Sequence, residues 1–499
     1  TSMGQMRFLV PQQSCVPDEA LERAYLAGME WIPWRGNKWW VDRDTAREFI
    51  LERSEEESGN LYIPWQVDGF GELTLATASL MERDPQYCLD LELARGVVNR
   101  LRNQVAEWEA AGLSLPPEFF DRMSEASTAL IDSVIGQADE DVRFERSTQA
   151  IRVALETGDL LVKLYTNQAF AARHEQVAQL PTMLGAVLAC DVPQDAVATV
   201  YLEAANSAAV EVRWRDIEPS AGKFEWDALD QQLDWCHQNN LRVIAGPLLQ
   251  IDAVHLPDWL SLWEDDFEQL QAYARQFIQA AVDRYKDRVQ VWNCAARMNV
   301  RGSIILTEEQ TLRLIVAAIE EVRRADPSTP AIISIDRPWA EYMAADDSDL
   351  SPLHFSDSLV RADLGLAGIG LELNLGYWTG GTLPRDVLTI SQQIDRWSVL
   401  GLPLVIYITL PSGCEAVDPT SKFQPLPGFA GGATLETQHE LAEQLISLLM
   451  AKPFVQGVIW NQLTDAEPSQ FAHGGIFDAQ GLPKPVLAAM TSLRKQHLI

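Results

Sequence analysis

The feature that most constrains this chain is a regular alternation of short apolar runs and helical segments after residue 180. Eight runs have the length and composition of buried strands, namely Met183–Ala189, Val200–Val212, Leu241–Leu249, Val289–Ala296, Ala331–Asp336, Gly368–Asn374, Leu404–Thr409 and Val455–Trp460. Helical patterns lie between most of them, for example at Leu260–Tyr285 and Glu308–Arg324. Eight strand–helix units within roughly 300 residues predict a parallel sheet closed into a (β/α)8 barrel.

The first part of the chain has a different pattern, which predicts a separate domain. Residues 6–85 mix short strand-like runs with turns, and residues 90–178 have helical spacing that is broken at Pro116 and Pro117. A chain of 499 residues is also longer than one ordinary core supports. We therefore predict an α/β fold class, with an N-terminal strand-rich and helical domain (α+β) at residues 6–179 and a TIM barrel at residues 180–499.

Five tryptophans crowd the N-terminal segment: Trp31, Trp34, Trp39, Trp40 and Trp65. A flat platform of such rings stacks on sugars in carbohydrate-binding modules. The same residues also fill the core of small strand-rich domains. We favour this second interpretation, in which the tryptophans pack the domain or join it to its neighbour.

The charge balance limits the classes of partner. The chain has 71 acidic and 39 basic residues and a net charge of −32. Nucleic acids and anionic membrane surfaces require positively charged patches, so neither is expected as a partner. No apolar run has the length of a membrane span. A neutral carbohydrate is compatible with the charge, and the sequence leaves the oligomeric state open.

We expect a cytoplasmic protein that binds no cofactor. No apolar signal core follows Met6. The six cysteines are Cys15, Cys88, Cys190, Cys236, Cys294 and Cys414. None forms a close pair, which is typical of buried, reduced thiols. His255, His354 and His473 are interpreted as single surface or packing residues because no two share an element at metal-ligand spacing. No glycine-rich phosphate loop follows a strand.

Several motifs follow one another along the predicted barrel. They are Arg213-Trp214 with Ile217-Glu218-Pro219, Leu256-Pro257-Asp258-Trp259, Val291-Trp292-Asn293, Gly368-Ile369-Gly370, and Val458-Ile459-Trp460 with Pro483-Lys484-Pro485. In the same order, these stretches resemble motifs of glycoside hydrolase family 10, the xylanase family. The resemblance spans residues 180–490 or so. It implies a barrel in which Trp460 underlies the sugar at the cleavage point and Arg213 replaces a sugar-binding lysine.

The catalytic glutamates of that family are not matched here. Its fourth-strand motif, Trp-Asp-Val-Val-Asn-Glu, ends in the acid/base, and this chain has Arg297 in that place. Its seventh-strand motif ends in Thr-Glu, the nucleophile, and this chain has Tyr407 and Ile408 there. Retaining hydrolysis needs two carboxyl groups about 5–5.5 Å apart. An arginine has a pKa above about 12 and does not protonate a leaving oxygen at neutral pH. Ordinary xylanase chemistry at the inherited positions is therefore not expected.

Carboxylates, amides and aromatic rings remain at the predicted strand ends, where such barrels carry their function. The predicted substrate-binding residues are Arg213, Asp252, Arg297, Asn299, Arg337, Trp339, Asn374, Tyr377, Tyr407, Trp460, Asn461 and Asp465. Aromatic rings stack on sugar rings, and hydroxyl groups bond to carboxylates and amides. Arg297 is also suited to the carboxylate of an acidic sugar. The whole set predicts a carbohydrate ligand.

Glu372 is the most informative of the remaining carboxylates. Alternation along its apolar strand places it on one face with Gly368 and Gly370, and these small residues predict room inside the barrel. One interpretation makes Glu372 a relocated nucleophile or base, with Asp336 or Glu341 as the acid.

The same carboxylate also fits a structural role. A buried carboxylate needs a partner, and Arg297 or Arg337 can provide one. The sequence therefore leaves three functions open. They are a glycoside hydrolase with a rebuilt carboxylate site that acts on a poly- or oligosaccharide, a catalytically inactive carbohydrate-binding pseudoenzyme, and a scaffold that docks another protein.

Overall fold

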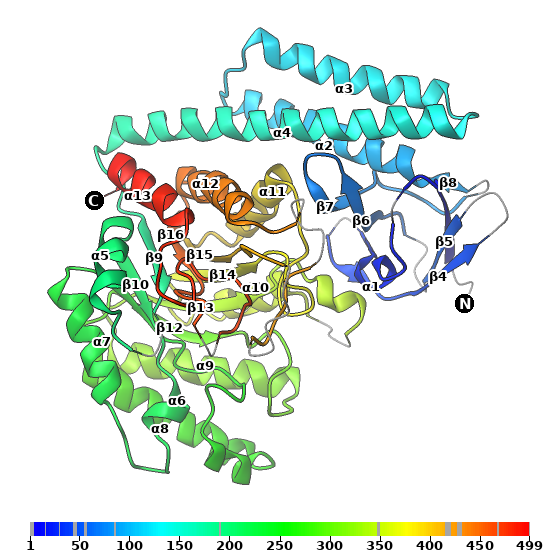
Figure 1. The fold of residues 1–499 in the computed structure, drawn as a ribbon. Coiled ribbons are helices and arrows are strands. Elements are labelled where there is room, and N and C mark those ends of the chain that lie inside the picture. Colours follow the sequence, from blue (N-terminus) through cyan, green and yellow to red (C-terminus); the bar gives the residue numbers. More distant parts are fainter. Residues whose placement is uncertain are drawn as a thin grey trace.

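The computed structural model shows two small sheets, a layer of long helices and a closed barrel in chain order (Figure 1). The structure describes residues 4–14, 16–28, 30–42, 47–53, 57–83, 86–188, 191–346, 350–414, 421–426, 432–466 and 469–498. Cys15 and Cys190, which are among the cysteines expected to be buried, reduced thiols, lie outside these residues. Cys88, Cys236, Cys294 and Cys414 are free thiols.

The N-terminal region contains two four-stranded sheets. The first has the order β4-β5-β1-β8, formed by Asn37–Asp42, Arg47–Arg53, Gly4–Val10 and Tyr87–Cys88. The second has the order β3-β2-β6-β7, formed by Pro33–Trp34, Tyr25–Ala27, Asn60–Val67 and Gly71–Ala76. The short helix α1 (Ala20–Arg23) separates β1 from β2. The expected N-terminal α+β region is therefore present.

The tryptophans of this region mainly pack its core, as the favoured interpretation predicts. Trp65 is buried, and Trp34 and Trp40 are half-buried against the main hydrophobic core. The Arg47 guanidinium lies 4.0 Å from the centre of the Trp40 ring. Trp31 differs from them, because it lines a polar cavity described below.

Three helices form a layer that covers both parts of the molecule (Figure 1). They are α2 (Leu89–Ala110), α3 (Pro117–Ile135) and α4 (Glu140–Gln176). The break predicted at Pro116 is confirmed, and α3 begins at Pro117 because proline suits the first turn of a helix and not its interior. At the start of α4, the Asp139 carboxylate accepts hydrogen bonds from the backbone N–H groups of Asp141 and Val142. Helix α4 packs on α2 and α3 and on two barrel helices, α11 (Val387–Trp397) and α12 (Leu435–Ala451).

The second part is a closed barrel of parallel strands, which confirms the predicted (β/α)8 fold. The strands are β9 (Met183–Val187), β10 (Ser207–Val210), β11 (Arg242–Ala245), β12 (Val291–Ala296), β13 (Ala331–Asp336), β14 (Gly368–Asn374), β15 (Leu404–Thr409) and β16 (Val455–Trp460). They follow one another around the barrel, and β16 closes on β9. The domain boundary at residue 180 stays a prediction.

The remaining helices surround the barrel. They are α5 (Asp195–Ala204), α6 (Trp214–Ile217), α7 (Asp227–Gln238), α8 (Phe267–Tyr285), α9 (Glu308–Ala325), α10 (Pro352–Arg361) and α13 (Val486–His497), with short 3-10 turns η1 (Asp258–Trp263), η2 (Glu341–Ala344) and η3 (Ser398–Leu400). The predicted strand at Val200–Val212 is wrong in its first half, which is the end of α5. A short apolar run has the same appearance in a buried helix and in a buried strand.

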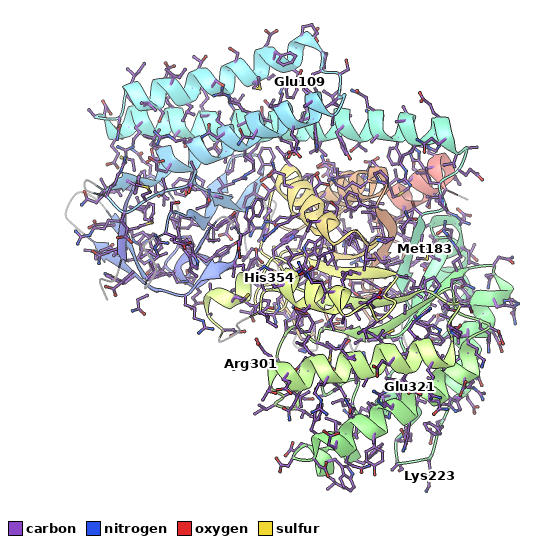
Figure 2. The ribbon with its side chains drawn as sticks, turned by 180° about the vertical axis from the view of Figure 1, so that it is seen from behind. Glu109, Met183, Lys223, Arg301, Glu321 and His354 are labelled. Atoms are coloured by element: carbon purple, nitrogen blue, oxygen red, sulfur yellow. The ribbon has the colours of Figure 1, made fainter. Side chains whose placement is uncertain are left out.

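Two apolar clusters form most of the hydrophobic core. The larger one runs without a break from the N-terminal sheets through the helical layer to the outside of the barrel. The smaller one fills the inside of the barrel and consists of Met183, Ala209, Ile244, Ile332, Val405, Tyr407 and Ile459. Seen from behind, the helical layer, marked by Glu109, and helix α9, marked by Glu321, lie on opposite sides of the barrel, marked by Met183 (Figure 2).

A buried ion pair joins the barrel to the second N-terminal sheet. Arg385 donates to Oε1 of Glu341 at 2.6 Å, and the backbone N–H of Leu383 donates to Oε2 at 3.0 Å. Arg385 also donates to the Tyr25 hydroxyl on strand β2. The side chains of Glu341 and Arg385 are 1% and 0% exposed. Burial raises the pKa of Glu341, and Arg385 opposes that rise. Glu341 therefore orders this junction.

We expect Glu341→Ala to lower the free energy of unfolding by about 3–5 kcal/mol, because Arg385 would keep its charge in a buried place without a counter-ion. Urea unfolding measures the change. The matched control is Glu268→Ala, which removes an exposed partner of Arg313 and should cost less than about 1 kcal/mol. Equal small losses in both variants would contradict the assignment.

Candidate functional site

The C-terminal ends of the barrel strands surround a small cavity, which we call the mouth cavity. Its volume is about 40 Å³. Its polar lining side chains are Glu211, Gln250, His255, Asn293, Arg297, Ser334, Glu372, Tyr407, Asn461 and Gln470. Such a volume holds a few water molecules, whereas sites for small organic ligands typically have about 300–1,000 Å³. The mouth cavity has no room for a sugar ring.

An ion pair between Arg297 and Glu372 joins the C-terminal ends of β12 and β14. The Arg297 Nε atom lies 3.0 Å from Oε1 and 2.9 Å from Oε2 of Glu372, and Nη2 lies 2.6 Å from Oε2. Nη2 also lies 3.3 Å from Oε1 of Gln470. Asn461 donates to Oε2 of Glu372 at 3.2 Å. Both oxygens of this carboxylate are therefore engaged, as in other charge-assisted arginine–carboxylate pairs.

The backbone of Arg297 is strained. Its φ angle is 57°, in the left-handed region, which costs an L-residue about 1–2 kcal/mol. Its N–H donates to the Ser334 carbonyl at 3.0 Å. Arg297 follows β12 and Glu372 lies on β14, so the ion pair spans β13. The strained backbone conformation is stabilised in this place by that pair.

The space that Gly370 leaves beside Glu372 is filled by protein side chains. A Cβ atom at Gly370 would collide with the Ser334 hydroxyl and would lie 3.1 Å from the Tyr407 ring. Tyr407 is paired with Glu372 across β14 and β15 and is 5% exposed. The glycine therefore makes space for the tyrosine, and burial raises the pKa of Tyr407 above its usual range.

Asp336 lies next to Glu372, as the sequence prediction of a carboxylate pair requires. The two residues are in register on the neighbouring strands β13 and β14. Burial raises the pKa of Asp336, and Arg297 and Arg337 oppose the rise. Oδ1 of Asp336 is buried and has no hydrogen-bond partner among the described residues. Arg337 Nε lies 3.3 Å from Oδ2, close enough for attraction but not aligned for a hydrogen bond.

Glu211 and His255 form part of a second charged group that sequence reasoning missed. His255 Nδ1 lies 2.8 Å from Oδ1 of Asp252, and its Nε2 lies 3.8 Å from Oε1 of Glu211. At 3.8 Å the contact between His255 and Glu211 is an electrostatic attraction and is too long for a hydrogen bond. Arg213 donates to Glu211 at 2.9 Å. His255 is therefore a buried packing residue, as one of the two interpretations has it, with charged partners that the sequence analysis did not identify. Glu211 was detectable, because it lies two residues before Arg213 at a strand end.

The charges of this group stabilise one another. Burial alone would raise the pKa of Glu211, but His255 and Arg213 outweigh it and lower the pKa to about 2. Burial would lower the pKa of His255, but Asp252 and Glu211 outweigh it and raise that pKa. Glu211 thus faces the mouth cavity as a carboxylate, and the two acidic side chains favour the protonated form of His255.

Of the predicted site residues, Arg297, Glu372, Tyr407 and Asn461 line the mouth cavity. The predicted side chains of β14, β16 and the loops after them bind other groups of the protein. The Trp460 indole donates to the Gly474 carbonyl at 2.7 Å, the Tyr377 hydroxyl donates to the Ala472 carbonyl at 2.9 Å, Asp465 pairs with Lys484 at 2.5 Å, and Asn374 accepts from Asn461 at 3.1 Å. These contacts fix the loops after β14 and β16.

Strand β13 ends in residues that are tied to its neighbours. Asn299 donates to the Asp336 carbonyl at 2.8 Å and accepts from the Asp336 N–H at 3.0 Å. Arg337 donates to the Thr379 carbonyl at 3.1 Å. Trp339 is 4% exposed, and the Arg385 guanidinium lies 5.5 Å from its ring centre. Glu341 lies at the junction described above and does not line the mouth cavity.

A larger cleft opens beside the mouth cavity, with a volume of about 870 Å³. It lies between the loop after β12 and the first turns of α9 and α10, and Arg297, Asn299 and Arg301 line it. Arg301 is labelled at the end of α9 in Figure 2. Apolar side chains, including Ile304 and Phe355, form its other wall. This cleft has the size that a saccharide requires.

Within the described part of the chain, no group of three or more His, Cys, Asp or Glu side chains is placed to hold a metal ion. The helices that the structure describes include none with the length and apolar character of a membrane span.

The raised pKa of His255 predicts a pH-dependent stability. Because its native pKa lies above the unfolded value of about 6.5, the protonated ring stabilises the fold fully below about pH 6.5. This contribution is lost as the pH rises through the native pKa. We therefore expect the difference in unfolding free energy between the unmodified protein and His255→Gln to shrink as the pH rises above about 6.5.

Urea unfolding at several pH values measures this difference. Glu211 stays ionised over the whole range, since its pKa is about 2. The exposed His354→Gln is the matched control for the loss of an imidazole. A difference between the unmodified protein and His255→Gln that stays constant with pH would contradict the charged state of His255.

Known proteins resemble the barrel in sequence. The family model described as Glycosyl hydrolase family 10 matches residues 188–328. The chain is 28% identical over 282 residues to endo-1,4-beta-xylanase C from Paenibacillus barcinonensis, over 52% of this chain and 24% of that protein. The chain therefore spans about a quarter of the length of that curated relative.

Solved structures give weaker likenesses. Xylanase 10B from Thermotoga petrophila RKU-1, in complex with xylobiose, has a TM-score of 0.49 and 18% identity, over 65% of this chain and 96% of that chain. The GH10 structure from Paenibacillus barcinonensis has a TM-score of 0.47 and 17% identity, over 64% of this chain and 97% of that chain. The assignment rests on the family match and on the closed parallel barrel itself. The family match over residues 188–328 and the closed parallel barrel together show a fold like that of glycoside hydrolase family 10.

Proposed function

We propose that this xylanase-like barrel is a catalytically inactive, carbohydrate-binding pseudoenzyme. The observation that carries the proposal is the Arg297–Glu372 ion pair, in which Nη2 lies 2.6 Å from Oε2. A nucleophilic carboxylate needs a free oxygen directed at the sugar, and a general acid needs a proton to give. Glu372 has both oxygens engaged, and Arg297 holds its protons at any physiological pH.

The size of the mouth cavity supports the same proposal. A volume of about 40 Å³ excludes a sugar ring from the place where cleavage would occur. The neighbouring cleft of about 870 Å³ has room for a saccharide. Arg301 offers N–H donors there, and Ile304 and Phe355 offer apolar contacts for the C–H faces of sugar rings. A β-1,4-linked saccharide is the proposed ligand because the curated relative is an endo-1,4-beta-xylanase.

One observation favours a second candidate, a glycoside hydrolase with a rebuilt carboxylate site. Asp336 is buried next to Glu372, its pKa is raised, and its Oδ1 has no partner among the described residues. A general acid needs such a raised pKa. In this candidate Asp336 protonates the leaving oxygen and Glu372 attacks. Glu372 would first have to separate from Arg297, and Tyr407 would have to leave the mouth cavity. Glu341 does not fit the role of acid, since it is bound to Arg385.

Turnover assays separate the two candidates. We expect the unmodified protein to release no sugar from β-1,4-xylan and no phenol from a dinitrophenyl β-xyloside, whose leaving group departs without a proton. The second candidate instead predicts turnover of xylan that falls by about 10²–10⁴ in Asp336→Asn and disappears in Glu372→Gln. Glu268→Gln, an exposed change on α8, is the control for both. Turnover that depends on Glu372 would overturn the pseudoenzyme proposal.

Binding tests the other half of the proposal. We expect β-1,4-linked xylo-oligosaccharides to bind without being cleaved, as measured by isothermal titration calorimetry. Arg301→Ala should weaken the cleft's Kd about three- to tenfold, because it removes hydrogen bonds to sugar hydroxyls. Arg102→Ala removes an exposed arginine of α2 outside the cleft and should leave that Kd unchanged. If no saccharide binds in the cleft, the carbohydrate-binding function is wrong.

A further inference from the structure

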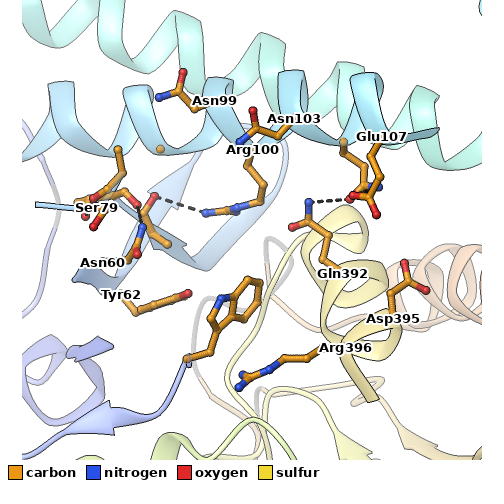
Figure 3. Close-up of a pocket in the computed structure, with 16 residues that line it drawn as sticks. Asn60, Tyr62, Ser79, Asn99, Arg100, Asn103, Glu107, Gln392, Asp395 and Arg396 are labelled. Atoms are coloured by element: carbon orange, nitrogen blue, oxygen red, sulfur yellow. Dashed lines mark hydrogen bonds between the residues drawn. The ribbon is translucent and has the colours of Figure 1, made fainter. Parts of the chain in front are cut away.

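A second large cavity lies far from the barrel mouth, between the second N-terminal sheet, helix α2 and helix α11 (Figure 3). Its volume is about 790 Å³, within the range of sites for small organic ligands. We name it the interlayer cavity. Helix α2 contributes Asn99, Arg100, Asn103 and Glu107 along one side, and α11 contributes Gln392, Asp395 and Arg396 on the other (Figure 3).

The side of α2 that lines the interlayer cavity is a regular polar stripe. Its lining residues are Gly96, Asn99, Arg100, Asn103, Gln104 and Glu107. These positions are spaced by three and four residues, so they share one face of the helix. The apolar face of the same helix, which includes Val97, Leu101 and Val105, packs into the core. A polar face that turns towards another layer of the same protein needs partners, and here it borders a cavity.

Two amides of the stripe are available to a ligand. The side chains of Asn99 and Asn103 make no hydrogen bond with any other residue that the structure describes. The amide of Gln392 donates to Gln104 at 2.8 Å, and that of Asn60 donates to the Thr77 carbonyl at 2.7 Å. The carbonyl oxygens of Gln392 and Asn60 remain as acceptors. The cavity therefore offers both donors and acceptors, in amide groups.

The charged residues of the cavity are engaged within the protein. Arg100 donates to the Thr389 hydroxyl at 2.8 Å and lies 3.8 Å from Asp386. Asp395 accepts from Lys452 at 2.6 Å. The lining has two arginines, Arg100 and Arg396, and two carboxylates, Glu107 and Asp395. Their charges balance, so the cavity favours a ligand that is polar and uncharged.

An aromatic ring completes the cavity. Trp31 lines it, is half-buried, and has a φ angle of 60°. Residues with large side chains rarely adopt this left-handed conformation. The backbone N–H of Trp31 donates to the Gly28 carbonyl at 3.0 Å, and the Arg396 guanidinium lies 5.6 Å from the centre of the Trp31 ring. Strained residues of this kind occur where a side chain must be held against a ligand.

We propose that the interlayer cavity binds a short, neutral saccharide. A sugar ring presents an apolar C–H face that stacks on an indole ring, and hydroxyl groups that pair with amides. Trp31 supplies the first surface, and Asn99 and Asn103 supply the second. The proposal uses only the residues of this cavity and does not depend on the function proposed for the barrel. It gives the N-terminal region a binding role of its own.

The test is calorimetric titration of the full chain with neutral β-1,4-linked oligosaccharides of xylose, glucose and mannose. Arg301→Ala serves as the background, so that the cleft beside the barrel mouth binds more weakly and contributes less to the signal. We expect binding to persist in this background. The double variant Asn99→Ala/Asn103→Ala should weaken it about tenfold, and Trp31→Ala should remove it. Trp263→Ala changes a half-buried tryptophan outside the cavity and should have no effect.

Two results would overturn the proposal. One is the absence of saccharide binding at millimolar concentration in the Arg301→Ala background. The other is a Kd that the double asparagine variant leaves unchanged. Asn99 is half-buried and Asn103 is exposed, so their replacement does not threaten folding. The double variant therefore decides the outcome even if Trp31→Ala is unstable. The second result does not bear on the barrel, whose function is tested by the turnover and binding assays described above.

Discussion

The barrel mouth depends on the ion pair between Arg297 and Glu372. Burying two charges costs several kcal/mol for each ion, and the cost is recovered only when the geometry is good and the other polar atoms are satisfied. Here the guanidinium makes three contacts with the carboxylate, and Asn461 and Gln470 complete the shell. The pair closes the centre of the mouth with protein atoms, and any ligand must then bind beside it.

The rest of the mouth is arranged around this closure. Tyr407 fills the space beside Gly370, and Glu211, His255 and Asp252 form a charged group that also faces the mouth cavity. Each group is paired inside the protein. A glycosidase instead keeps one carboxyl group protonated and another free to react with the sugar. Asp336 has a feature of the first role, because burial raises its pKa.

The N-terminal region is joined to the barrel by a continuous core and by the buried contact of Arg385 with Glu341 and Tyr25. Helix α4 extends over both parts and packs on α11 and α12 (Figure 1). The interlayer cavity exists because α2 turns a polar stripe towards α11. The N-terminal region and the barrel thus form the interlayer cavity together, and neither part forms it by itself.

The sequence alone determined the fold class, and it predicted Arg297 in place of a glutamate at the end of the fourth-strand motif. Both depend on local patterns: strands β13 to β16 have the predicted bounds, and Arg297 stands at the end of its own strand motif. It also proposed Arg297 and Arg337 as partners of Glu372 without choosing between them. The tertiary structure alone decided that Arg297 is the partner, that His255 lies between Glu211 and Asp252, and that Glu341 binds Arg385. Most of these contacts join residues from different strands and loops, and only barrel closure brings such residues within hydrogen-bonding or ion-pair distance.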